Sequence, residues 1–235
     1  MPELKPATRS PRRGTRARHA GFTLAELAVV LVILGLLTGS MLVPLGARME
    51  ARDRQRTADM LRDIEQALTG FAIVHGRLPC PSTEPDPASP QYGLEDPAPC
   101  NLSIEGRLPW RTLGMPAQDA WGSARQSAGD DWAGHWRYRV DTAFVAGTVG
   151  THTAPISNLQ IRADDGSAIT TLSNSQAVAI VLSTGPNRRP DGHNASFSSS
   201  APLYESGEPS AAFDDLLVWI GRPLLVARLA QAGRL

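Results

Sequence analysis

Three groups of residues have types and spacing that allow chemistry: a lone carboxylate at the start of a long apolar run, two cysteines, and a late loop rich in Asp, Glu and Asn. None of them has the pattern of an enzyme site. The sequence contains no Gly-rich phosphate loop, no Gly-x-Ser-x-Gly turn and no His-Glu-x-x-His pair. Lys5 is the only lysine, which excludes lysine Schiff-base chemistry downstream of it, and the five histidines are scattered singly. We therefore expect a protein that binds or assembles, and no enzyme is indicated.

The carboxylate of Glu26 is the only charge between Phe22 and Leu45, a run of 24 residues. A helix of that length would extend about 36 Å, which is enough to cross the hydrocarbon core of a membrane. A carboxylate inside a membrane is costly unless it has a partner. Glu26 therefore either has a specific partner or, lying near one end of the run, reaches the headgroup region.

The charges before this run predict its orientation. Residues 1–21 carry six basic residues and one acidic residue, so 17 of the 23 basic and 22 of the 23 acidic residues lie in the remainder. Cations beside an apolar span keep that end in the cytoplasm, which places the following domain in the periplasm. The mildly acidic remainder gives no support for general nucleic-acid binding.

The order of small and apolar residues differs from that of a secretory signal. Ala20 and Gly21 come before the apolar run, whereas the cleavage site of a secretory signal follows it. This order suits removal of the basic head alone. The alternative is an ordinary signal anchor.

A seven-residue stretch between the basic head and the apolar run resembles the processing site of type IV pilins and type II secretion pseudopilins; it is Gly21-Phe22-Thr23-Leu24-Ala25-Glu26-Leu27. The resemblance implies that a prepilin peptidase cuts between Gly21 and Phe22 and then N-methylates Phe22. It also implies that Glu26 pairs with the new amine, often that of a neighbouring subunit, and so fixes axial register in a filament. The head is longer than many leaders of the family, and Ala20 stands where a basic residue is common.

These features divide the chain into four parts: a basic leader (1–21), a transmembrane and assembly helix (22–45), an amphipathic continuation of that helix (46–76) and a periplasmic globular β-rich domain (77–235). In the third part, apolar residues recur at helical spacing and predict one buried stripe, made of Leu61, Ile64, Leu68 and Phe71.

The expected fold class is α+β and pilin-like, with a long N-terminal membrane-spanning helix packed on an antiparallel β-sheet. Alternating or continuous apolar patterns predict strands at 135–140, 159–162, 168–172, 177–183 and 216–220, and a short helix at 223–232. The run from Ala177 to Leu182 is continuously apolar and should be buried on both faces. Residues 184–213 are expected to form a long loop.

Cys80 and Cys100 enclose 19 residues, of which six are proline, so the segment is neither helix nor central strand. In the periplasm the pair fits a disulfide, which would stabilise the fold by about 3 kcal/mol. The alternative is two reactive or metal-binding thiols. The pair lacks the Cys-x-x-Cys spacing and the nearby histidines that such a site uses.

The long loop and the residues after it contain several acidic and amide side chains. Some pseudopilins bind calcium in a loop before the final strands, and Ca²⁺ needs hard oxygen ligands. The resemblance thus implies a possible calcium site, for which the candidates are Asn187, Asp191, Asp214 and Asp215. The loop has no EF-hand spacing, and an acidic loop that is merely solvated is the alternative. No other cofactor is expected.

We expect a pilin-like filament subunit, either a minor pilin of a type IV pilus or a pseudopilin of a type II secretion pseudopilus. The resemblance implies as partners sister subunits, the prepilin peptidase, the inner-membrane assembly platform and membrane lipid. It implies a bacterial inner-membrane protein with its N-terminus in the cytoplasm, which later enters the pilus or pseudopilus. The alternative is a single-span periplasmic binding or sensor module that never polymerises.

Overall fold

The computed structural model describes residues 23–98, 100, 105–122, 135–170, 175–195 and 202–235, and for residues 39–45 it describes the backbone alone. The expected leader and the cleavage residues Gly21 and Phe22 lie outside the described residues. The chain divides into two compact units, one ending at Ala47 and one running from Arg48 to Leu235.

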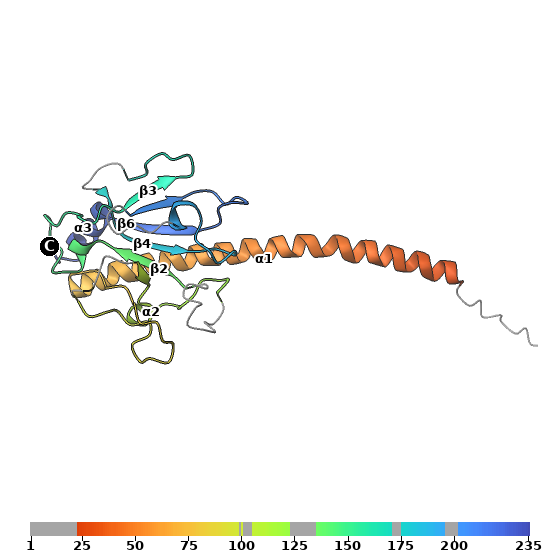
Figure 1. The fold of residues 1–235 in the computed structure, drawn as a ribbon, viewed down its shortest axis with the longest axis horizontal. Helices are drawn as coiled ribbons and strands as arrows, with labels where there is room; N and C mark the ends of the chain where they lie inside the picture. The colour runs from red at the N-terminus through yellow and green to blue at the C-terminus, as the bar shows by residue number, and fades with distance from the viewer. Residues whose placement is uncertain (1–22, 99, 101–104, 123–134, 171–174, 196–201) are drawn as a thin grey trace, which may run out of the picture. The chain divides into compact units, whose positions relative to one another are not determined.

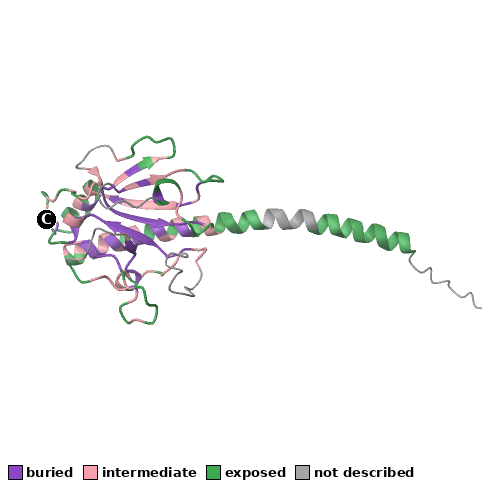
Figure 2. Ribbon diagram, viewed as in Figure 1, coloured by how far each residue is buried: buried purple, intermediate pink, exposed green. Residues whose placement is uncertain are grey.

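Helix α1 (Leu24–His75) begins in the first unit and ends in the second. In the first unit its described side chains are mostly apolar by sequence, and Figure 2 colours these residues green, as exposed. Six consecutive residues, 29–34, are each about half exposed or more, so the exposed apolar surface goes all the way round the helix. Among the described residues, no helix combines the length and hydropathy that a membrane crossing requires.

In the second unit α1 is amphipathic, and the expected buried stripe is confirmed. Leu61, Ile64 and Leu68 are at most 4% exposed, and Phe71 is 9% exposed. Residues three and four apart lie on one side of a helix, which is why this spacing gives a single buried face. The helix ends at Gly76, which adopts the left-handed conformation (φ +73°) and donates its N–H to the carbonyl of residue 72 at 2.8 Å.

A four-stranded antiparallel sheet packs against this stripe (Figure 1). Its strand order is β1–β2–β4–β6, with bounds Gly106–Arg107, Arg137–Val140, Ala177–Ser183 and Leu216–Gly221. Ala179 and Val181 of β4 belong to the core on the α1 side, whereas Ile180 and Leu182 belong to a second core on the other side. Strand β4 is therefore buried on both faces, as its continuous apolar run predicted.

The second face of β4 is covered by a two-stranded parallel sheet that no sequence pattern predicted. Strand β3 (Gln160–Ala163) pairs with β5 (Leu203–Ser206), and Ile161 stands opposite Tyr204 in their register. Both side chains are buried in one cluster with Ile180. The second unit thus has three layers: the helix, the antiparallel sheet and the small parallel sheet.

Two strand predictions need correction. The strand expected at 168–172 is wrong in its described part, because residues 168–170 follow a tight turn and form a single bridge, Ala168 to Arg162. Residues 171 and 172 lie outside the described residues. Strand β5 lies in a segment expected to be loop; it is four residues long and depends on a partner far earlier in the sequence.

Short helical segments complete the second unit: α2 (Trp110–Leu113), the 3₁₀ helices η1 (Thr142–Phe144) and η3 (Gly192–Ala195), and the final helix α3 (Arg222–Gln231). Helix α3 confirms the expected C-terminal helix to within a residue. Its Leu225 and Leu229 are at most 1% exposed and join the core on the α1 side.

Candidate functional site

Glu26 caps the start of α1. Its Oε2 accepts hydrogen bonds from the backbone N–H of Thr23 at 3.0 Å and from the Thr23 hydroxyl at 3.1 Å. The N–H of Glu26 donates back to the Thr23 hydroxyl at 3.2 Å. This reciprocal arrangement is a capping box, which satisfies N–H groups that the first turn of a helix leaves without partners. It holds the carboxylate in the first turn, close in sequence to the expected cleavage point.

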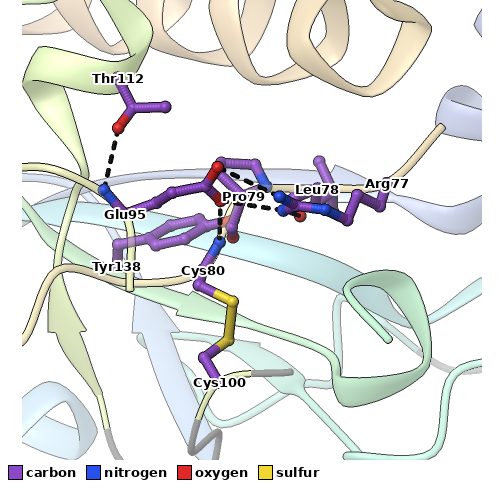
Figure 3. A network of polar contacts seen from close by, with 8 residues as sticks. All are labelled: Arg77, Leu78, Pro79, Cys80, Glu95, Cys100, Thr112 and Tyr138. Atoms are coloured by element: carbon purple, nitrogen blue, oxygen red, sulfur yellow. Dashed lines mark hydrogen bonds and ion pairs between the residues drawn. A yellow bond between two sulfur atoms is a disulfide. The ribbon is translucent and has the colours of Figure 1, made fainter. Parts of the chain in front are cut away.

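Cys80 and Cys100 form the expected disulfide, with 5.9 Å between their Cα atoms (Figure 3). Cys80 is fully buried in the core on the α1 side. Beside it, the buried hydroxyl of Tyr138 donates to the carbonyl of Pro79 at 3.0 Å. Burial raises the pKa of Tyr138 well above its ordinary value, so the hydroxyl remains a donor. The start of the loop is therefore fixed to strand β2.

Glu95 ties the proline-rich loop to the segment that leaves α1 (Figure 3). Both terminal nitrogens of Arg77 donate to its carboxylate, at 2.9 and 3.1 Å, and the backbone N–H of Cys80 donates to it at 3.1 Å. The N–H of Glu95 itself donates to the hydroxyl of Thr112 at 2.9 Å. A two-bond pairing of arginine with carboxylate is stronger and more directional than a single bond. The loop is thus held at two points, the disulfide and Glu95.

Three of the four candidate calcium ligands come together. Asp191, Asp214 and Asp215 each have a carboxylate oxygen within 4.8 Å of those of the other two. Asn187 lies beside them with its amide nitrogen, which donates to both oxygens of Asp191 at 3.1 Å. Its amide oxygen accepts from the N–H of Arg189. In this arrangement Asn187 steadies Asp191, while the three carboxylates form the oxygen-rich centre.

Asp215 is the most buried member of this acidic cluster, with 5% of its surface exposed. Its Oδ2 accepts from the backbone N–H of Asp191 at 2.9 Å and from the amide of Asn194 at 2.9 Å. Its Oδ1, like that of Asp214, is buried and has no hydrogen-bond partner among the described residues. Leaving a buried acceptor without a partner costs free energy, so both oxygens have the capacity to coordinate a cation.

The charge of the acidic cluster also fits a cation. Burial is the main reason that the pKa of Asp215 is raised to about 7. The hydrogen bonds from Asp191 and Asn194 lower this pKa, whereas the carboxylates of Asp191 and Asp214 raise it. Burial and the Asp191 carboxylate likewise raise the pKa of Asp214. A hard divalent cation such as Ca²⁺ would offset this repulsion with the oxygen ligands that it prefers.

A groove of about 320 Å³ between α1 and β6 leads to the acidic cluster. Arg54, Leu61 and Arg62 of α1 line one side of it, and Asp215 and β6 line the other. Asp215 is therefore the member of the acidic cluster that forms part of the wall of this groove.

A sequence model for the prokaryotic N-terminal methylation motif matches residues 16–42. Two proteins named type II secretion system core protein G are similar to the chain. The one from Pectobacterium carotovorum subsp. carotovorum is 34% identical over 120 residues, which cover 46% of this chain and 66% of that protein. The one from Klebsiella pneumoniae is 39% identical over 62 residues, which cover 26% of this chain and 44% of that protein. The methylation motif and these two relatives together support the type IV pilin and type II secretion pseudopilin family for this chain.

The chain spans just under two thirds of the length of the first relative and less than half of the second. No solved structure gives a significant match. The matched motif includes Gly21, Phe22 and Glu26. Of these three residues, the structure describes Glu26, which caps helix α1.

Sequence reasoning missed three residues that the structure places at these sites: Thr23, Glu95 and Asn194. The pattern Thr-x-x-Glu at residues 23–26 is typical of a capping box, so the role of Thr23 could have been predicted from the sequence. Glu95 and Asn194 gave no such signal, because their partners lie 11 to 21 residues away and no local pattern connects them.

Replacing both cysteines, Cys80→Ser with Cys100→Ser, should lower the free energy of unfolding by about 3 kcal/mol, since the disulfide restricts the unfolded chain. Urea unfolding of the full chain in mild detergent, followed by circular dichroism, measures this change. Wild-type protein under reducing conditions is the matched control and should behave like the double variant. A loss below about 1 kcal/mol would mean that the Glu95 contacts alone hold the loop.

Proposed function

We propose that this protein is a pseudopilin: a subunit that loses its basic leader, is methylated at Phe22 and assembles into a type II secretion pseudopilus. The observation that carries the proposal is the methylation motif over residues 16–42, in which Glu26 is held by a capping box at the start of α1. Both relatives named above are core proteins of type II secretion systems, which favours a pseudopilus over a type IV pilus.

The proposal includes a membrane-bound stage. Residues 22–45 would lie in the inner membrane, with the leader in the cytoplasm and residues 48–235 in the periplasm, before the assembly platform passes the subunit into the filament. Residues 29–34 present exposed apolar side chains on every side of the helix. This surface supports a membrane-bound stage, because a helix that is apolar on every side is stable only in an apolar environment. Lipid tails and neighbouring helices are similarly apolar, so the transfer between them costs little.

The N-terminal residue of the protein extracted from membranes tests the processing step. We expect intact-mass and N-terminal sequencing to find methylated Phe22, because the prepilin peptidase is proposed to cut after Gly21. In Gly21→Val, a branched side chain replaces the small residue before the cut, and the leader should remain. Wild-type protein that retains Met1 would instead support a non-polymerising single-span binding or sensor module.

Glu26 caps the helix, and we propose that it also pairs with the amine of Phe22; two substitutions of Glu26 separate these roles. Glu26→Ala and Glu26→Gln should both insert into the membrane yet fail to enter filaments, as measured by immunoblotting of sheared filaments. Glutamine keeps an acceptor for the Thr23 hydrogen bonds but removes the charge that pairs with the amine. Normal incorporation of Glu26→Gln would contradict the charge-pairing role while leaving the cap intact.

We also propose that Asp191, Asp214 and Asp215 hold a calcium ion. Their oxygens lie within 4.8 Å of one another, and two of them are buried without a hydrogen-bond partner among the described residues. Oxygen ligands of this kind suit Ca²⁺, whereas Mg²⁺ gives up its water shell reluctantly and demands a near-octahedral site. The ion would join the loop before η3 to the start of β6.

Calcium should therefore raise the melting temperature of the full chain, and EDTA should reverse the rise. At a calcium concentration 100-fold above the Kd, mass action adds about 2.7 kcal/mol of stability. Differential scanning calorimetry of the wild type, Asp215→Asn and Asp165→Asn measures the effect. Asp215→Asn should lose the response, whereas Asp165→Asn, which removes an exposed carboxylate outside the cluster, should keep it. A wild type that does not respond would remove the calcium proposal.

A further inference from the structure

The short loop at residues 191–195 lies against two features at once. Its first residue, Asp191, belongs to the acidic cluster, while η3 within it packs along strand β5. The N–H of His193 donates to the carboxylate of Glu205 on β5 at 3.1 Å. Gly192 adopts a left-handed conformation (φ +48°), and a Cβ atom there would collide with the same carboxylate. The loop is therefore closely fitted to the strand.

Asn194 makes the contact between these two features. It is 2% exposed, and its Nδ2 donates both to Oδ2 of Asp215 at 2.9 Å and to the carbonyl of Glu205 at 3.1 Å. Its Oδ1 accepts the backbone N–H of Glu205 at 2.9 Å. Bonding both the N–H and the carbonyl of one residue is what an adjacent antiparallel strand does at a hydrogen-bonded pair. The side chain of Asn194 thus occupies the edge of β5 at Glu205.

A covered strand edge matters because backbone groups along an open edge pair readily with another chain. At Glu205 the cover is one amide side chain, and the same amide holds Asp215. With Oδ2 of Asp215 bonded to Asp191 and Asn194, its second oxygen is the one left for a ligand. Residues behind a metal site that fix the orientation of the ligands in this way usually govern its affinity.

We propose that Asn194 is the positioning residue of the acidic cluster and that a calcium ion bound there holds loop 191–195 on the edge of β5. The inference rests on the calcium site proposed above. The ion joins Asp191, at the start of the loop, to Asp215, and Asn194 carries that restraint to Glu205. Without the ion, repulsion among the three carboxylates pushes Asp191 away from Asp215, which loosens the loop and uncovers the edge.

Hydrogen exchange of the wild-type full chain, kept in mild detergent, tests the coupling directly. If the loop opens only after calcium leaves, calcium at 100-fold its Kd should slow exchange of the Glu205 amide about 100-fold. The amide of Ala163, which bonds to the carbonyl of Ser167 on the other edge of β3, is the internal control and should change far less. Equal exchange of the Glu205 amide with and without calcium would overturn the coupling.

The variant Asn194→Ala tests the positioning role. Its calcium affinity, measured by isothermal titration calorimetry, should fall about 10- to 100-fold, as is usual when a residue behind a metal ligand is removed. Its Glu205 amide should exchange fast with or without calcium. The matched control is Gln176→Ala, which removes a partly buried amide that bonds Asn158 away from the loop, and it should bind calcium like the wild type.

The outcomes separate this inference from the proposal on which it depends. If the wild type binds no calcium in the calorimeter, the calcium site and the coupling both fail. If it binds calcium but the Glu205 amide does not respond, or if Asn194→Ala binds as tightly as the wild type, only the present inference fails. Should Asn194→Ala not fold, the wild-type exchange experiment alone decides.

Discussion

The burial of one stripe of α1 against the antiparallel sheet is the contact on which the rest of the second unit depends. Leu61, Ile64 and Leu68 share a single core with side chains from β2, β4, β6 and α3. Because β4 also carries apolar side chains on its other face, that face needs a cover, which the parallel pair β3–β5 supplies. The end of β4 and the start of β6 are adjacent strand ends, so the layered core also brings the loop at 184–194 close to Asp214 and Asp215.

The same helix meets a different requirement at each end. Around residues 29–34 it is apolar on every side and needs an apolar environment all round, whereas beyond Arg48 one face is polar and only a stripe is buried. Glu26 stands at the start of the apolar part, where its charge would be expensive if left alone. The capping box with Thr23 gives the carboxylate hydrogen bonds that the helix start requires in any case. One residue thus caps the helix, and in sequence it lies four positions after Phe22, where processing is proposed to create an amine.

The parts of the fold that could be predicted are those whose cause lies nearby in the sequence. The stripe on α1 follows from spacing, β4 from a continuous apolar run, and α3 from three leucines in phase. Strand β5 was missed because four residues of mixed character become a strand only when β3 lies beside them. The two residues of β1 are likewise a strand only because β2 pairs with them. The acidic cluster was anticipated from residue type, but the contacts of Asn187 and Asn194 depend on loop geometry that no local pattern reveals.

The position of β6 and α3 at the end of the described chain has a consequence for how the protein folds. Ile220, Leu225 and Leu229 complete the core around a helix stripe that is synthesised about 150 residues earlier, so the decisive contacts have high contact order. Until those last elements emerge, the stripe on α1 has only part of its cover and exposes apolar surface to other molecules. The second unit can therefore reach its final packing only after β6 and α3 have been made and have docked on the stripe of α1.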